Sequence, residues 1–120
     1  MERVSFITHK GKSIMMIDFS HCEAKEILLL LDEVQQTVAR HERGSLLTLG
    51  DWTGAHVNRD VATRMKEVLV MNRPFVKRSA WVGLDSVPHV YYENFKSFSQ
   101  RQLPAFKTRE EAMDWLVGES

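Results

Sequence analysis

The stretch Ser45–Gly54, Ser-Leu-Leu-Thr-Leu-Gly-Asp-Trp-Thr-Gly, joins a short apolar segment to a polar bend that ends in glycine. Leu46–Leu49 has the apolar character of a strand in the interior of a sheet. The bend Asp51–Gly54 that follows combines residue types that favour turns. In open α/β sheets, ligands and partners usually bind beyond the carboxyl ends of inner strands. We therefore expect the rest of the fold, and its functional site, to be arranged around this bend.

Upstream of this stretch, the sequence predicts two strands and a long helix. The strands span Arg3–His9 and Ser13–Phe19. They are joined by Lys10-Gly11-Lys12, a tight connection in which glycine tolerates a positive φ, so they should pair antiparallel. Apolar residues then recur on one face at the helical spacing of about 3.6 residues from about Glu23 to Glu42, and Gly44 ends this helix.

Downstream, helical and strand patterns alternate to the end of the chain. The predicted elements are a helix at Asn58–Asn72, a strand at Val76–Leu84, a helix opened by Asp85–Pro88, a minimal strand at Ala105–Lys107 and a last helix opened by the capping box of Thr108 and Glu111. Strands joined by helices pair in parallel through right-handed crossovers. We expect one α/β domain over residues 1–120, with four helices and a five-stranded mixed sheet whose first strand is antiparallel and the rest parallel.

One face of this sheet is predicted to lack a cover. If the strands lie side by side in chain order, every crossover places its helix on the same face. The opposite face would then carry four apolar side chains, those of Ile14, Met16, Leu46 and Trp81. We expect a partner subunit or a bound ligand to cover it. Leu29 and Val70 each lie opposite the buried stripe of their helix and are candidates for a homodimer contact.

The composition narrows the class of protein. The chain has 16 basic and 16 acidic residues, so no global field would attract nucleic acid or an anionic membrane. The longest apolar run, Ile27–Leu31, is too short to span a bilayer, and the residues after Met1 contain no long apolar run that would predict a signal peptide. The lone cysteine, Cys22, suits a reducing compartment. We expect a cytoplasmic protein without integral membrane association.

Several segments together resemble the SpoIIAA-like (STAS-like) family of small bacterial domains. The matching segments are Thr8–Lys12, Ile17–Phe19, Leu47–Gly54, Val76–Leu84 and Thr108–Leu116. They cover most of the chain, and their order and spacing carry the resemblance. It implies a SpoIIAA-like β-α superhelix with one leading antiparallel strand, and a binding or regulatory role. A second resemblance, in fold only, is to CRAL-TRIO lipid-transfer domains, which implies an apolar ligand.

The resemblance also implies a candidate phosphorylation site. Related anti-anti-sigma proteins carry Asp-Ser-Ser-Gly after the equivalent strand, and phosphorylation of its serine switches partner binding. Asp51-Trp52-Thr53-Gly54 lies at a similar place, which makes Thr53 the corresponding position. This chain departs from the pattern, because Trp52 replaces a small residue and residues 55–57 intervene before the cap residue Asn58.

The bend and its surroundings supply the candidate ligand-binding residues, which are Asp51, Trp52, Thr53, Gly54, His56, Arg59 and Tyr92. Free helix N–H groups beside Arg59 favour an anion such as a phosphate or carboxylate head group. Trp52 would stack on a ring or chain, and Tyr92 would line a pocket because it lies off the buried stripe of its helix. The alternative is structural: Asp51 bonds the turn, Gly54 relieves strain and Trp52 covers the sheet edge.

Other chemistries find little support. The five histidines show no paired spacing for a metal ion, and the chain has no glycine-rich phosphate loop. An enzyme could use Asp18, Asp51 or Cys22, but nothing beyond the positions of these residues indicates a catalytic role. We therefore expect a non-enzymatic domain with no cofactor, which binds a small amphipathic or anionic ligand at the carboxyl ends of its strands. The alternative is a protein-interaction switch that is phosphorylated at Thr53.

Overall fold

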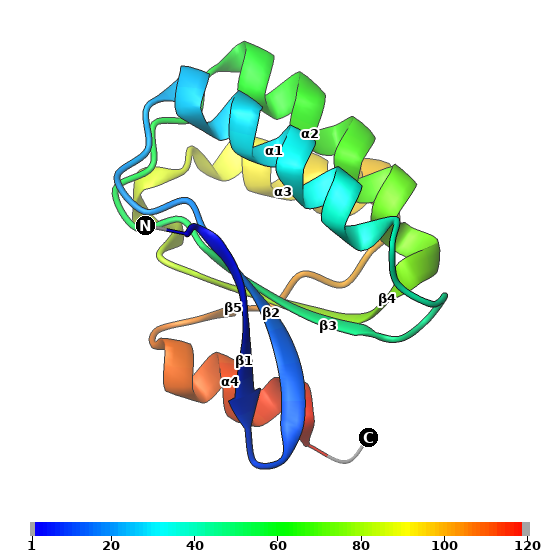
Figure 1. Cartoon of the computed structure of the whole chain (residues 1–120). Coiled ribbons are helices and arrows are strands. Elements are labelled where there is room, and N and C mark those ends of the chain that lie inside the picture. Colours follow the sequence, from blue (N-terminus) through cyan, green and yellow to red (C-terminus); the bar gives the residue numbers. More distant parts are fainter. Residues whose placement is uncertain (1, 119–120) are drawn as a thin grey trace.

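The computed structural model describes residues 2–118 and has the predicted alternation of strands and helices (Figure 1). The strands are β1 (Val4–His9), β2 (Lys12–Asp18), β3 (Leu46–Asp51), β4 (Val76–Val82) and β5 (Ala105–Phe106). The helices are α1 (Ala24–Val38), α2 (Arg59–Asn72), α3 (His89–Ser99) and α4 (Arg109–Val117), with short 3-10 turns η1 (Arg73–Phe75) and η2 (Leu84–Ser86).

The five strands form one sheet in chain order, β1-β2-β3-β4-β5. β1 pairs antiparallel with β2, and every other pair is parallel, which confirms the predicted mixed sheet. β3 is the middle strand, and all six of its residues are buried. The stretch from which the prediction started is therefore the centre of the sheet.

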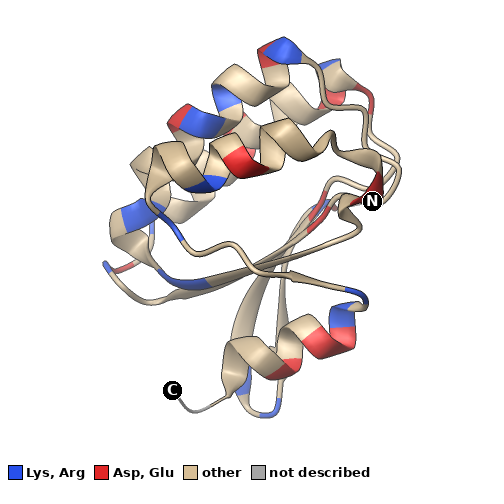
Figure 2. Ribbon diagram, turned by 180° about the vertical axis from the view of Figure 1, so that it is seen from behind, with Lys and Arg blue, Asp and Glu red and all other residues tan. Residues whose placement is uncertain are grey.

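The helices cover both faces of the sheet, with α1, α2 and α3 on one face and α4 on the other (Figure 1). The larger core lies under the first three helices and includes Met15, Ile17 and Leu31. A smaller core lies under α4, where Ala112 and Leu116 pack against the strands. Acidic and basic residues are spread over all layers rather than gathered in one (Figure 2).

The prediction of an uncovered sheet face was wrong. α4 follows the last strand, so no crossover to a further strand constrains its side, and it packs over Ile14 and Met16. Trp81 lies on the opposite face, because its register partner is Gly50, whereas Met16 is in register with Leu49 on the α4 side. Leu46 also joins the larger core, since a register shift separates it from Leu47. This face needs no partner subunit or ligand to cover it.

Several element ends differ from the predicted ones; β3, for example, runs to Asp51 rather than to Leu49. α1 stops at Val38, its last core-facing residue, rather than continuing to Glu42. β4 stops at Val82, because Gly83 takes a left-handed conformation with φ of 73° and turns the chain into η2. Leu29 and Val70 are 68% and 44% exposed, and their role in a homodimer stays a prediction. Within residues 2–118, none of the helices combines the length and apolarity that crossing a bilayer requires.

Candidate functional site

Trp52, the tryptophan of the bend after β3, lies inside the protein. Trp52 is fully buried, with 0% exposed surface. Its ring stacks on Phe19, with centroids 4.1 Å apart, and meets the edge of Trp81 at 5.3 Å. The ring is therefore enclosed and offers no face to a ligand at the sheet edge, contrary to the expectation that it would stack on one. The indole Nε1 is the only buried side-chain nitrogen or oxygen within residues 2–118 that lacks a hydrogen-bond partner.

Asp51 holds the bend and connects it to α4. Its Oδ1 accepts hydrogen bonds from the backbone N–H and the hydroxyl of Thr53, at 2.9 and 2.7 Å. Its Oδ2 accepts from Nε of Arg109 at 2.8 Å and lies 2.7 Å from Nη2 of the same guanidinium. Burial by itself would raise the pKa of Asp51, but the hydrogen bonds from Thr53 and then Arg109 outweigh it, so the pKa lies below its usual value. The carboxylate is thus ionised, and both of its oxygens accept hydrogen bonds from the protein.

The two aspartates at the strand tips lie next to each other. Asp18 and Asp51 are register partners at the ends of β2 and β3. Oδ1 of Asp18 is 3.7 Å from Nη2 of Arg109 and 3.8 Å from Nη1 of Arg3. Arg109 of α4 thus lies beside both strand-tip carboxylates, and Arg3, which precedes β1, lies beside Asp18.

The other predicted site residues are divided among neighbouring surfaces. Gly54 and His56 line a groove of about 570 Å³ between the bend and the starts of α1 and α3. Tyr92 lines an adjoining groove of about 600 Å³, and its hydroxyl donates to the carbonyl of Leu103 at 2.5 Å. Arg59 is exposed at the start of α2 and lines neither groove. Ligand binding by these residues stays a prediction.

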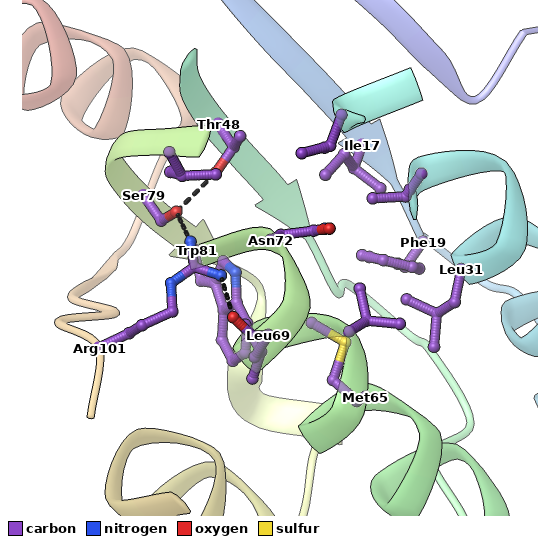
Figure 3. Close-up of a pocket in the computed structure, with 14 residues that line it drawn as sticks. Ile17, Phe19, Leu31, Thr48, Met65, Leu69, Asn72, Ser79, Trp81 and Arg101 are labelled. Atoms are coloured by element: carbon purple, nitrogen blue, oxygen red, sulfur yellow. Dashed lines mark hydrogen bonds between the residues drawn. The ribbon is translucent and has the colours of Figure 1, made fainter. Parts of the chain in front are cut away.

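Sequence reasoning missed a polar cluster inside the molecule. A cavity of about 30 Å³ lies between the sheet and helices α1 and α2 (Figure 3). Most of its wall is apolar and includes Ile17, Phe19, Leu31 and Met65. The polar residues in its wall are Thr48, Asn72, Ser79 and Arg101. The signal for this cluster was present in the sequence, since Thr48 and Ser79 are polar residues on two adjacent buried strands.

Arg101 connects this cavity to the surface. Its Nη2 donates to Oγ of Ser79 at 2.5 Å, and its Nη1 donates to the carbonyl of Leu69 at 3.2 Å (Figure 3). Oγ of Ser79 is also 2.6 Å from Oγ1 of Thr48. Burial, with a smaller contribution from the charge of Arg73, lowers the pKa of Arg101 to about 10. Within residues 2–118, no carboxylate lies within 4.0 Å of this guanidinium.

The remaining candidate reactive groups are the possible metal ligands and the thiol of Cys22. In the described part of the chain, no group of three histidine, cysteine or acidic residues is placed to hold a metal ion. Cys22 is fully buried, and burial raises the pKa of its thiol. A thiol in that environment is a poor nucleophile at neutral pH.

Comparison with known proteins identifies the class of fold. The sequence matches no family model and no curated protein. Among solved structures, the chain is similar to an uncharacterised protein of the DUF3478 family with a SpoIIAA-like fold from Shewanella loihica PV-4. The TM-score is 0.69 at 13% sequence identity, and the match covers 95% of this chain and 92% of that chain. The fold is therefore SpoIIAA-like, as the sequence motifs predicted. At this identity the likeness concerns the fold alone.

Proposed function

We propose that this protein is a non-enzymatic binding domain for a small amphipathic anion. The observation that carries the proposal is Arg101, a partly buried guanidinium that has no carboxylate partner within residues 2–118 and lines a mostly apolar cavity. A buried cation is costly unless an anion pairs with it. An anionic head group beside Arg101 would supply that charge, and the apolar part of the ligand would extend between the sheet and helices α1 and α2.

This location replaces the strand-tip site that the sequence suggested. At the strand tips, the carboxylate of Asp51 is already engaged and the ring of Trp52 is enclosed. The Arg101 cavity holds about one water molecule as it stands, so an apolar chain would have to displace side chains. Met65, which lines the cavity from α2, has the flexible thioether that adapts most easily to such repacking.

Replacing Arg101 with methionine tests this proposal, because methionine keeps much of the apolar stem and removes the charge. We expect calorimetric titration of the wild-type protein with decanoate to show binding, and the Arg101→Met variant to bind about tenfold or more weakly, since a charge-assisted hydrogen bond is lost. Decanol, which lacks the charge, should bind both proteins equally weakly.

An Arg40→Met variant is the matched control. Arg40 is exposed just beyond α1, and within residues 2–118 its side chain bonds only to the hydroxyl of Thr37, so its replacement should leave decanoate binding unchanged. Absence of binding to wild-type protein, or equal binding by the Arg101→Met variant, would contradict the proposal.

A second candidate function is a protein-interaction switch that is phosphorylated at Thr53. The observation that favours it is the exposure of Thr53 together with its 2.7 Å hydrogen bond to Asp51, which also binds Arg109 of α4. A phosphate at Thr53 would repel the Asp51 carboxylate and compete with it for Arg109. Phosphorylation would thereby loosen the attachment of α4 to the sheet edge.

We expect a Thr53→Glu variant to show faster amide hydrogen exchange in α4 than the wild-type protein, because the added charge weakens the Asp51–Arg109 contact. Thr53→Ser keeps the hydroxyl and should exchange like the wild type. Affinity capture with the two variants would then show whether partner binding follows the state of α4. Unchanged exchange in Thr53→Glu, with unchanged capture, would exclude the switch.

A further inference from the structure

Outside the Arg101 cavity lies a groove whose charged lining residues, in the described part of the chain, are all basic. Its volume is about 440 Å³, and it runs between the end of α2, the start of β4 and the segment that follows α3. Arg101 lines both this groove and the internal cavity. The other cations in its wall are Arg73, Lys77 and Arg78, and no acidic residue among residues 2–118 lines it.

None of these four cations has a carboxylate partner within residues 2–118. Within residues 2–118, Arg73, Lys77 and Arg101 take part in no ion pair shorter than 4.0 Å. The guanidinium of Arg78 also has no carboxylate partner there, but it is engaged by other groups: it lies 3.9 Å from the centre of the Trp115 ring and donates to the carbonyl of Gly118 at 2.9 Å. The charge of Arg73 contributes to the lowered pKa of Arg101, so these two cations interact unfavourably.

The C-terminus of α2 accounts for only part of this positive charge. Cations near a helix C-terminus are favourable, and Arg101 donates to the carbonyl of Leu69 in the last turn of α2. That interaction satisfies one N–H of one guanidinium. It leaves Arg73 and Lys77, which line the same groove, without an anionic partner in the described chain.

The number of cations in the groove indicates how much negative charge the bound head group would have. A single carboxylate is matched by one guanidinium in a bidentate pair, whereas a phosphate monoester has a charge of about −1.5 to −2 at neutral pH and three acceptor oxygens. Arg101 already uses N–H groups of both its terminal nitrogens on Ser79 and Leu69, so its fork is only partly free for a carboxylate. A phosphate head group, which is larger and more highly charged than a carboxylate, can instead be bound by several cations at once.

We propose that the anionic head group recognised here is a phosphate monoester, held in the outer groove by Arg73, Lys77 and Arg101 with its apolar chain directed into the cavity. This inference rests on the proposed function and specifies its ligand class. It places the head group away from the bend after β3, since the groove is built around residues 76–79 at the start of β4 and residues 100–102.

Calorimetric titration with three probes tests the inference: decyl phosphate, decanoate and inorganic phosphate. We expect wild-type protein to bind decyl phosphate about tenfold or more tightly than decanoate. A double variant, Arg73→Gln with Lys77→Gln, should lose most of this preference and keep its affinity for decanoate within about threefold, because Arg101 remains. A second double variant, Lys25→Gln with Lys107→Gln, has the same change of net charge at exposed residues outside the groove and should keep the preference.

The outcomes separate the inference from the proposed function. Equal affinity for decyl phosphate and decanoate in the wild type, or an unchanged preference in the Arg73–Lys77 double variant, would overturn the phosphate site alone. Failure of both decyl ligands to bind would overturn the proposed function and the inference with it. Inorganic phosphate that binds as tightly as decyl phosphate would support the phosphate site, identify free phosphate as its source and overturn the role of the apolar chain.

Discussion

Replacement of Trp52 by alanine is expected to lower the free energy of unfolding by about 3–5 kcal/mol, the range for removing a large buried aromatic side chain. Trp52 is fully enclosed and stacks on Phe19 from the end of β2 while its ring meets Trp81 from β4. Its loss would leave a cavity at the point where three strands meet the helices. Urea denaturation followed by far-ultraviolet circular dichroism measures the change without relying on tryptophan fluorescence.

Two further variants test whether the burial of Trp52 is the cause of this loss of stability. Nε1 of Trp52 has no hydrogen-bond partner among residues 2–118, so Trp52→Phe strands no polar group and should cost markedly less than Trp52→Ala, on the order of 1–2 kcal/mol. Trp115→Ala removes the same type of side chain from a partly exposed position on α4 and should also cost less than Trp52→Ala. If Trp52→Ala proves as mild as Trp115→Ala, Trp52 does not anchor the core in the way its burial indicates.

The order and pairing of the elements could be predicted because their signals are local. Lys10-Gly11-Lys12 predicts a hairpin, and the structure has a left-handed glycine there with φ of 81°. The capping box of Thr108 and Glu111 forms as the sequence indicated. The side of the sheet taken by α4 was not predictable in the same way, since no following strand constrains it and the choice depends on its packing against Ile14 and Met16.

The candidate sites show a similar division between local and long-range information. Asp51, Thr53 and Gly54 form the bend at the strand end where the sequence placed it. The burial of Trp52 depends on rings from other strands, which no pattern within the bend encodes. Arg101 lies in an irregular segment without a motif, and its hydrogen-bond partners Ser79 and Leu69 are 22 and 32 residues away in the chain. Such a site emerges only from the assembled fold.

Replacement of Arg109 by glutamine is expected to destabilise the protein at neutral pH by about 2 kcal/mol, because it removes a charge-assisted pair of contacts from a nearly buried carboxylate. The value lies below that for a fully buried pair because the Arg109 side chain is 46% exposed to solvent. Asp51 has a lowered pKa in the folded protein. Its stabilising contribution is therefore complete above the unfolded-state pKa of about 3.9 and is lost as the pH falls through the folded-state pKa.

The pH dependence distinguishes this electrostatic cause from a loss of packing. Urea denaturation at neutral pH and at about pH 3, below the unfolded-state pKa of about 3.9, should show a smaller difference between wild type and Arg109→Gln in acid, because the stabilisation that comes from the lowered pKa of Asp51 decreases there. Arg109→Lys keeps the charge without the planar fork and should fall between the two proteins at neutral pH. Arg64→Gln is the matched surface control, since Arg64 pairs with the exposed Asp32, and should change stability by less than about 1 kcal/mol. A difference for Arg109→Gln that is the same at both pH values would mean that Arg109 holds α4 by packing, and that the charge of Asp51 has no part in fastening that helix to the sheet.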